Sequence, residues 1–150
     1  MRVLAVRQPW ASLIAEGLKS IEIRSRHTRI REDIAIYASR TKESVDEDTY
    51  VYNVLYKDLG INWRDLPKRP LPHGKILAVA SLSGCTSFSK HEFLSTKHQH
   101  WNPGWCYQEG KTYGWILKNV RKVAPFEFKF SGSVVWSAIG NEIIELHEVV

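Results

Sequence analysis

The apolar runs of this 150-residue chain are all short, which limits its fold more than any other feature. The strongest, residues 76–82 (Ile-Leu-Ala-Val-Ala-Ser-Leu), has the length and composition of a buried β-strand. None approaches the ~18–20 apolar residues of a membrane-spanning helix. The N-terminus reaches a charge at Arg7 before any secretory apolar segment forms. We therefore expect a cytoplasmic protein, without a membrane partner, that is built mostly from short strands.

Two segments in the first half have helical patterns, and the remaining periodic segments read as strands. Pro9 and Gly17 bound the first helix, and an apolar stripe that ends at Gly60 marks a longer one over residues 44–59. Strands are expected over residues 3–6, 20–25, 34–38, 76–82, 113–120, 126–130, 134–136 and 143–146.

The connections between these elements do not follow a regular strand–helix–strand alternation. Residues 61–73 contain three prolines and read as a loop, and residues 83–112 read as a long loop with room for one helical turn. No internal repeat or domain boundary is evident. The pattern predicts one α+β domain over residues 1–150, a small mixed β-barrel with short helices rather than a doubly wound sheet.

The charge balance points to a polyanionic partner. The chain has a formal net charge of +5. The excess is concentrated: residues 67–133 hold ten Lys or Arg against three Asp or Glu, whereas residues 134–150 hold three acids and no base. Separated blocks of charge favour nucleic acid as a partner, and solubility alone is the alternative interpretation.

One segment, Gly17-Leu-Lys-Ser-Ile-Glu-Ile-Arg24, carries the candidate chemistry. Glu22 and Arg24 are two residues apart on a strand, so their side chains project from the same face, and Lys19 lies at the turn before it. Such a cluster serves anion recognition by Lys and Arg, or proton transfer by a Lys–Glu pair. The alternative is a surface ladder of ion pairs.

These residues resemble the signature of the ASCH (activating signal cointegrator homology) domain. The family has a Gln-Pro opening before a short helix, matched by Gln8-Pro9-Trp10-Ala11, and then the pattern G-x-K-x-x-E-x-R, matched by residues 17–24. Later stretches are also similar, namely residues 72–78, the strand Tyr113-Gly-Trp-Ile-Leu-x-Asn-Val120, and residues 131–136.

The resemblance implies a PUA-like fold that binds RNA or related nucleotides in a cleft walled by the G-x-K-x-x-E-x-R strand. One branch of the family deacetylates N4-acetylcytidine without a metal, using a Lys–Thr–Glu set. Lys19 matches the lysine of that set, but Glu22 stands where the threonine would be, so the nucleophile is missing at that position. Another branch has been proposed to cut RNA. Binding of RNA or a nucleotide in a basic cleft is therefore the expected function, with DNA as a further partner and a metal-independent hydrolase or ribonuclease as the alternative.

The candidate ligand-binding residues follow from charge and aromatic content. Arg24 and Arg26 share the strand face of Glu22 and suit phosphate oxygens, although a solvated turn explains the arginines equally well. Trp10 beside the motif, and Trp105 in a polar loop, are the tryptophans expected to stack on bases. The expected ligand-binding residues are Trp10, Lys19, Glu22, Arg24, Arg26 and Trp105.

If the protein is an enzyme, Lys19, Glu22 and Ser20 are the catalytic candidates, because a hydroxyl beside a lysine can act as a nucleophile. We assign no metal ligand, since the spacing of His91, His98, His100 and Cys106 matches no zinc pattern. No cofactor motif is present, and Cys85 and Cys106 are expected to be free thiols.

Overall fold

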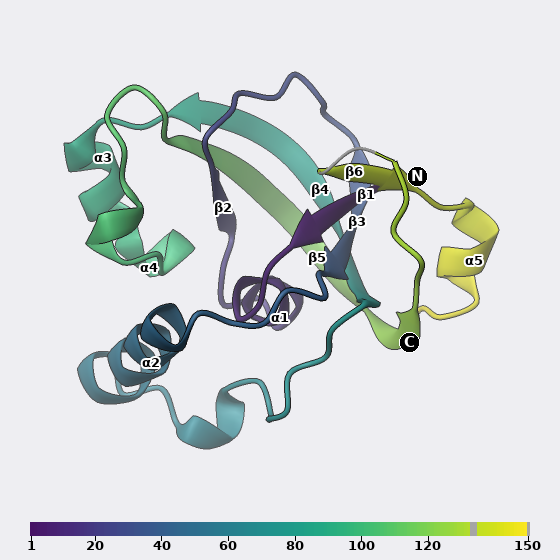
Figure 1. The fold of residues 1–150 in the computed structure, drawn as a ribbon, viewed down its shortest axis with the longest axis horizontal. Helices are drawn as coiled ribbons and strands as arrows, with labels where there is room; N and C mark the ends of the chain where they lie inside the picture. The colour runs from purple at the N-terminus through teal and green to yellow at the C-terminus, as the bar shows by residue number, and fades with distance from the viewer. Residues whose placement is uncertain (133–134, 150) are drawn as a thin grey trace.

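The computed structural model describes residues 1–132 and 135–149. Within them, six strands form one mixed sheet in the order β2-β5-β4-β3-β1-β6 (Figure 1). The strands are β1 (Arg2–Val6), β2 (Ile21–Arg24), β3 (Asp33–Ala38), β4 (Lys75–Ser87), β5 (Tyr113–Glu127) and β6 (Trp136–Ala138). Of the pairings among these named strands, β1 with β3 is parallel and the rest are antiparallel.

The sheet curls without closing. Its two longest strands, β4 and β5, bend together, and their pairing shifts register at three points. Each shift is a bulge or irregularity, and bulges increase the local bend and twist of a sheet. The expected α+β fold with short helices is confirmed. Among the described strands the sheet is open and does not close into a barrel, because β2 and β6 remain its two edges. We call the gap between β2, at one side of the sheet, and the β1–β6 pair, at the other side, the seam.

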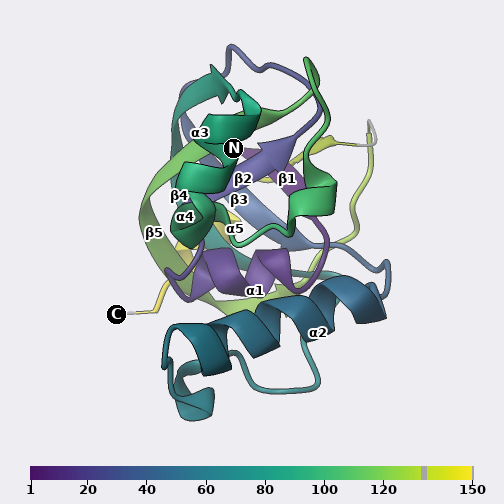
Figure 2. The same cartoon turned by 90° about the vertical axis from the view of Figure 1, so that its left-hand side faces the viewer.

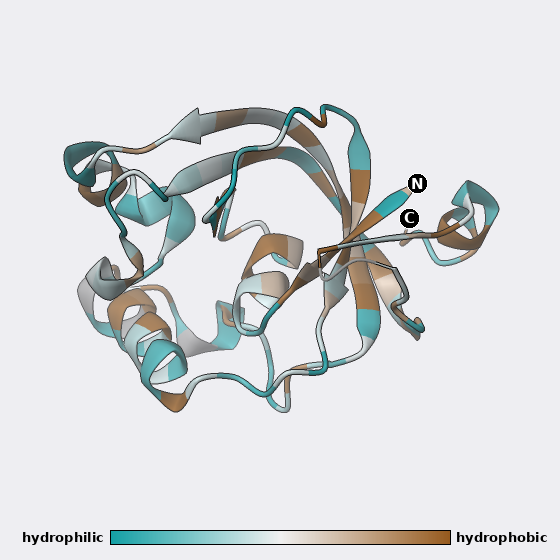
Figure 3. Cartoon of the chain, turned by 45° about the horizontal axis from the view of Figure 1, so that its top comes forward, coloured by the Kyte–Doolittle hydropathy of each residue, from teal (hydrophilic) through white to brown (hydrophobic). Residues whose placement is uncertain are grey.

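Helices α1 (Trp10–Ala15) and α2 (Val45–Asn53) pack inside and below the curl, respectively. Helix α1 is buried at every residue, and α2, extended by a π-helical turn over Val54–Asp58, runs beneath it (Figure 2). Both expected helices are therefore present. Hydrophobic residues concentrate on α1 and on alternate positions of the strands around it (Figure 3), where Leu4, Ile14 and Ile36 are fully buried.

The segment expected as a long loop over residues 83–112 contains regular structure. Strand β4 continues to Ser87, and α3 (Lys90–Ser95), α4 (Lys97–His100) and a 3-10 turn (Gly104–Cys106) follow. Ser89 and Glu92 form a reciprocal capping box, and Phe93 is buried in a cluster with Ile21 and Phe88. A cap together with one buried aromatic residue stabilises a helix too short to show a clear period.

Two expected strands in the C-terminal region differ in the structure: one is replaced by a helix, and the other contributes only its first two residues, Phe126 and Glu127, to β5. Residues 143–146 lie in and just after helix α5 (Asn141–Glu145), since a short apolar run fits a helix and a strand equally well. Strand β5 runs continuously to Glu127, and then Phe128 and Phe130 leave the sheet and pack on Tyr37. Val134, expected in a strand, lies outside the described residues. A 3-10 turn (Trp63–Asp65) interrupts the proline-rich loop.

The Gln-Pro opening of the motif has a structural role. The Gln8–Pro9 peptide is cis, and Gln8 is buried. Its side-chain amide donates to Ser12 Oγ (2.7 Å) and to the Pro72 carbonyl (2.8 Å), and its Oε1 accepts from the Ser12 amide (2.9 Å). Gln8 therefore joins the first turn of α1 to the loop before β4.

In the described part of the chain, no helix is both long and apolar enough to cross a membrane.

Gly114, in the Trp-containing strand of the motif, tests this packing. A Cβ at position 114 would lie 2.5 Å from Cζ of the buried Phe88 and 3.0 Å from Cγ2 of Ile21. We expect Gly114→Ala to lower the free energy of unfolding by about 1–3 kcal/mol through overpacking, as measured by urea denaturation. Gly104→Ala is the matched control, because a Cβ there meets no heavy atom within 4 Å, and equal destabilisation by both would contradict the packing account.

Candidate functional site

The turn after α1 delivers Lys19 to the site. Gly17 ends the helix with φ +77°, a left-handed conformation that favours glycine. The Leu18 and Lys19 amides then both donate to the Leu13 carbonyl, at 2.9 and 3.1 Å. This compact turn places Lys19 two residues before β2, with its side chain directed toward His100 and Asn102.

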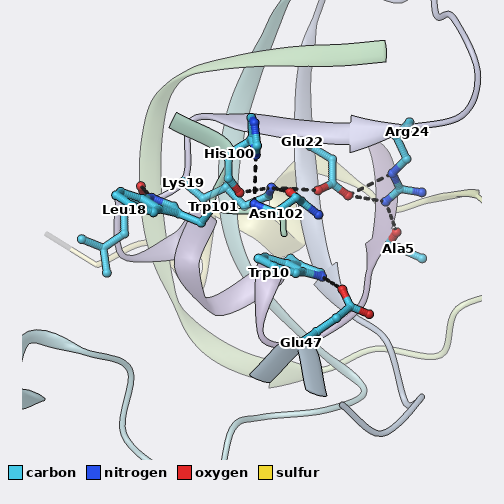
Figure 4. A network of polar contacts seen from close by, with 10 residues as sticks. All are labelled: Ala5, Trp10, Leu18, Lys19, Glu22, Arg24, Glu47, His100, Trp101 and Asn102. Carbon is cyan, nitrogen blue, oxygen red and sulfur yellow. Dashed lines mark hydrogen bonds and ion pairs between the residues drawn. The ribbon is translucent and has the colours of Figure 1, made fainter. Parts of the chain in front are cut away.

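Lys19 is fully buried, with 0 % of its side chain exposed. Its Nζ donates to the His100 carbonyl and to Asn102 Oδ1, both at 2.6 Å (Figure 4). The same amine lies 3.7 Å from Glu22 Oε1 and 4.9 Å from the centre of a Trp10 ring. The lysine is thus held by two oxygen acceptors, one carboxylate and one aromatic face.

Glu22 and Arg24 continue the ionic chain toward the surface. They lie on the same face of β2, as the alternation predicted. Glu22 Oε2 accepts a hydrogen bond from Arg24 Nε (2.9 Å) and forms an ion pair with Arg24 Nη2 (2.9 Å). Arg24 Nη2 also donates to the Ala5 carbonyl of β1 at 2.6 Å (Figure 4). One guanidinium therefore spans the seam between two strands that are not neighbours in the sheet.

Burial changes the acidity of Lys19. Loss of solvent lowers its pKa from 10.5 to about 8, and the nearby Glu22 carboxylate opposes this shift by favouring the charged form. The arrangement is a Lys–Glu–Arg chain of alternating charge with its lysine end dry and its arginine end near solvent.

His100 and Asn102, which form the far side of the lysine pocket, were missed as site residues from the sequence. His100 Nε2 donates to the Phe93 carbonyl (2.7 Å), and its Nδ1 accepts from the Asn102 amide (2.9 Å). These partners define a neutral ring, and burial lowers the pKa of His100 to about 4. No local signal marks this role, because Lys19 and its acceptors are more than 80 residues apart in the sequence.

A pocket of about 520 Å³ opens at the seam above this chain, and we call it the first pocket. Trp10, Glu22 and Arg24 line it, and Lys19 lies one layer behind its wall. The pocket's other charged lining residues are Arg7, Glu47 and Lys111. Glu47 Oε2 accepts from Trp10 Nε1 (3.1 Å), and Glu47 Oε1 accepts from Arg7 Nη2 (3.4 Å). Both pocket acids are thus engaged.

The remaining candidates lie elsewhere. Arg26 lines a neighbouring pocket on the other side of Arg24. Trp105 is 60 % exposed and packs edge-on against Tyr50 of α2, over a separate hollow. Ser20 lines neither pocket at the seam, and its backbone amide donates to the Gln99 carbonyl (2.9 Å). The structure therefore gathers Trp10, Glu22 and Arg24 at one pocket and separates the others from it.

The cysteines and histidines do not converge. Cys85 and Cys106 are free thiols, as expected, and Cys106 lies on the wall of the first pocket, where burial raises its pKa. His91 and His98 are exposed, whereas His100 is buried. In the described residues, no group of three or more His, Cys, Asp or Glu side chains is placed to hold a metal ion.

A curved, open mixed sheet with a helix inside it defines an α+β domain of the PUA-like class. The ASCH domain family model matches residues 4–127, and the chain belongs to this family. Crystal structures of the ASCH protein from Zymomonas mobilis are similar in fold.

The unsubstituted Zymomonas mobilis protein has a TM-score of 0.63 and 14% identity, covering 97% of this chain and 94% of that one. Two single-residue variants of it have TM-scores of 0.62 and 0.63 at 14% identity, each covering 97% of this chain and 95% or 97% of theirs. No curated protein matches the chain. The ASCH family is generally linked to RNA binding.

The buried lysine makes a measurable prediction. The folded-state pKa of Lys19 lies below its unfolded value, so between pH 8 and 10.5 the unfolded chain binds more protons. We therefore expect the stability that Lys19 contributes to rise with pH across this window. The check is the free energy of unfolding of the native chain minus that of Lys19→Met, measured by denaturation at several pH values.

NMR of the lysine amines gives an independent measurement. One resonance should titrate with a midpoint near pH 8 and should be missing from Lys19→Met. A stability difference that is flat with pH, together with no amine titrating below pH 9, would contradict the burial of Lys19.

Proposed function

We propose that residues 1–150 form a single ASCH-type domain that binds nucleic acid, preferentially single-stranded RNA, with one nucleotide in the first pocket. The observation that carries this proposal is the Lys19–Glu22–Arg24 chain, which is dry at one end and reaches the pocket at the other. Buried ion pairs contribute little net stability compared with apolar packing. Three charges arranged to end at a pocket are therefore better explained by recognition of a ligand than by stability.

Arg24 is the group best placed to meet a phosphate. Its side chain is 21 % exposed, and Glu22 and Ala5 orient its Nε and Nη2 atoms. Among the described residues, its Nη1 atom has no hydrogen-bond partner, so two N–H donors are available. An arginine whose orientation is already set loses little side-chain entropy when it binds an anion bidentately.

The size and polarity of the first pocket suit a nucleotide. Its volume of about 520 Å³ falls within the ~300–1,000 Å³ usual for small-molecule sites. Glu22 and Asn102 supply polar groups on its wall, and Trp10 supplies an aromatic one. Because both pocket acids are engaged by cations or an indole, the exposed Lys111 adds uncompensated positive charge.

Replacement of Arg24 tests the binding site. We expect Arg24→Gln to weaken binding of a short single-stranded RNA by about 10- to 100-fold, the range of a lost charge-assisted hydrogen bond. The slope of log affinity against log salt should fall by about 0.7, since one phosphate contact is lost. Fluorescence anisotropy over a salt series measures both quantities.

The matched control is Arg121→Gln, because Arg121 is exposed on β5 and pairs with Asp33 outside both pockets at the seam. It should leave the affinity nearly unchanged. Equal effects of the two substitutions, or a flat salt response of the native chain, would overturn the proposal. A DNA strand of the same sequence, measured in parallel, determines the preference for RNA.

A second candidate function, metal-independent hydrolysis of a modified nucleoside, is favoured by one observation. The lowered pKa of Lys19 leaves a fraction of its amine neutral near physiological pH, and a neutral amine is a base or a nucleophile. Its two short hydrogen bonds and the Trp10 face, however, enclose this amine behind the pocket wall.

We therefore expect no turnover of N4-acetylcytidine or of short RNA above that of a Lys19→Ala control, because the amine does not reach the pocket. Chromatography of the products over time provides the measurement. Turnover by the native chain that Lys19→Ala abolishes would instead establish the hydrolase.

A further inference from the structure

A second pocket, of about 610 Å³, adjoins the first at the seam. Arg24 and Ser25 line both pockets, so the end of β2 forms their common wall. The far wall of the second pocket comes from Trp136 at the opposite edge of the sheet, and Trp115 of β5 also lines it. The two pockets thus lie side by side along the opening between the sheet edges.

The second pocket is aromatic and basic. The Trp115 and Trp136 rings are stacked with centroids 5.8 Å apart at 16°. Arg24, Arg26 and His27 also line the pocket, and no acidic residue is among its described lining residues. Aromatic rings beside guanidinium groups are the surfaces on which unpaired bases stack.

The walls of this pocket are held in place by contacts within the domain. Trp115 Nε1 donates to the Arg26 carbonyl (2.9 Å), and this hydrogen bond attaches the loop after β2 to strand β5. The Arg24 guanidinium lies 5.6 Å from the centre of a Trp115 ring. His27 packs edge-on against Tyr113, with ring centroids 5.9 Å apart. A pocket fixed in this way loses little entropy when a base enters it.

Arg24 occupies the position that a linking phosphate requires. Arg24 lines both pockets, and its Nη1 atom has no hydrogen-bond partner among the described residues. Neighbouring nucleotides in a single strand are joined by one phosphodiester. A strand that placed one base in each pocket would therefore carry that phosphate past Arg24.

We infer that the second pocket is a subsite for the nucleotide adjoining the one in the first pocket, with Arg24 bound to the phosphate between them. This inference rests on the proposed function and adds to it a minimal ligand of two nucleotides. Trp136 and Arg26 contact the second base, whereas Trp10 and Glu22 face the first.

Calorimetric titration of the full chain with small probes tests this subsite. The probes are cytidine 5′-monophosphate and the dinucleotides ApC and CpA, which offer a neighbouring base in each direction. We expect one dinucleotide to bind about 5- to 100-fold more tightly than the mononucleotide, the gain that one stacked base supplies. Trp136→Ala should remove most of this gain, and Arg26→Ala part of it, while the mononucleotide affinity stays unchanged.

Two further variants keep the test decisive. Trp136→Phe retains an aromatic face and should keep most of the gain. If circular dichroism shows that Trp136→Ala is unfolded, the partial loss expected for Arg26→Ala carries the test. Arg121→Ala, outside both pockets, should change neither affinity.

The outcomes separate the subsite from the function on which it rests. If Arg24→Gln weakens binding of the mononucleotide but neither dinucleotide binds more tightly than the mononucleotide, the subsite is overturned and the proposed function stands. A gain that survives Arg26→Ala unchanged, and also Trp136→Ala if that variant folds, overturns the subsite as well. If no probe binds, the proposed function fails together with it.

Discussion

The candidate site is organised around one interaction, the Arg24 guanidinium that joins β2 to β1 across the seam. No backbone ladder connects these strands, so the side chain makes the connection, through Glu22 on its own strand and the Ala5 carbonyl on the other. The same opening holds both pockets. Strand β6 pairs with β1 only over Arg2–Leu4, and the Ala5 carbonyl just beyond this pairing accepts from Arg24, which also lines both pockets.

The buried Lys19 end of the ionic chain explains the role of the segment between β4 and β5. A fully buried ammonium group must have acceptors, because an unpaired charge in a dry site is very costly. The His100 carbonyl and Asn102 Oδ1 supply them. His100 is itself held by Phe93 and by the Asn102 amide, so α3 and α4 act as a support for Lys19. The lowered pKa of Lys19 reflects the remaining cost of its burial.

Local pattern predicted those features that need only neighbouring residues. Strand alternation placed Glu22 and Arg24 on one face, and the helix over residues 44–59 followed from its apolar stripe, its N-terminal cap and its terminal glycine. The sequence pattern failed where tertiary contacts determine whether a segment is a helix, a strand or a loop. Phe93 and a capping box made helix α3 out of an expected loop, and the short apolar run at Ile143–Ile144 became a helix.

By itself, the sequence determined the α+β class, the family motif and the single face that presents glutamate and arginine, because these follow from spacing along the chain. Only the tertiary structure decided that Lys19 is buried, that Arg24 separates two pockets and that Trp105 lies away from both. Burial and pocket walls arise from residues distant in sequence, such as Lys19 with Asn102 and Arg24 with Trp136. The spacing of a motif carries no information about which distant residues will cover it.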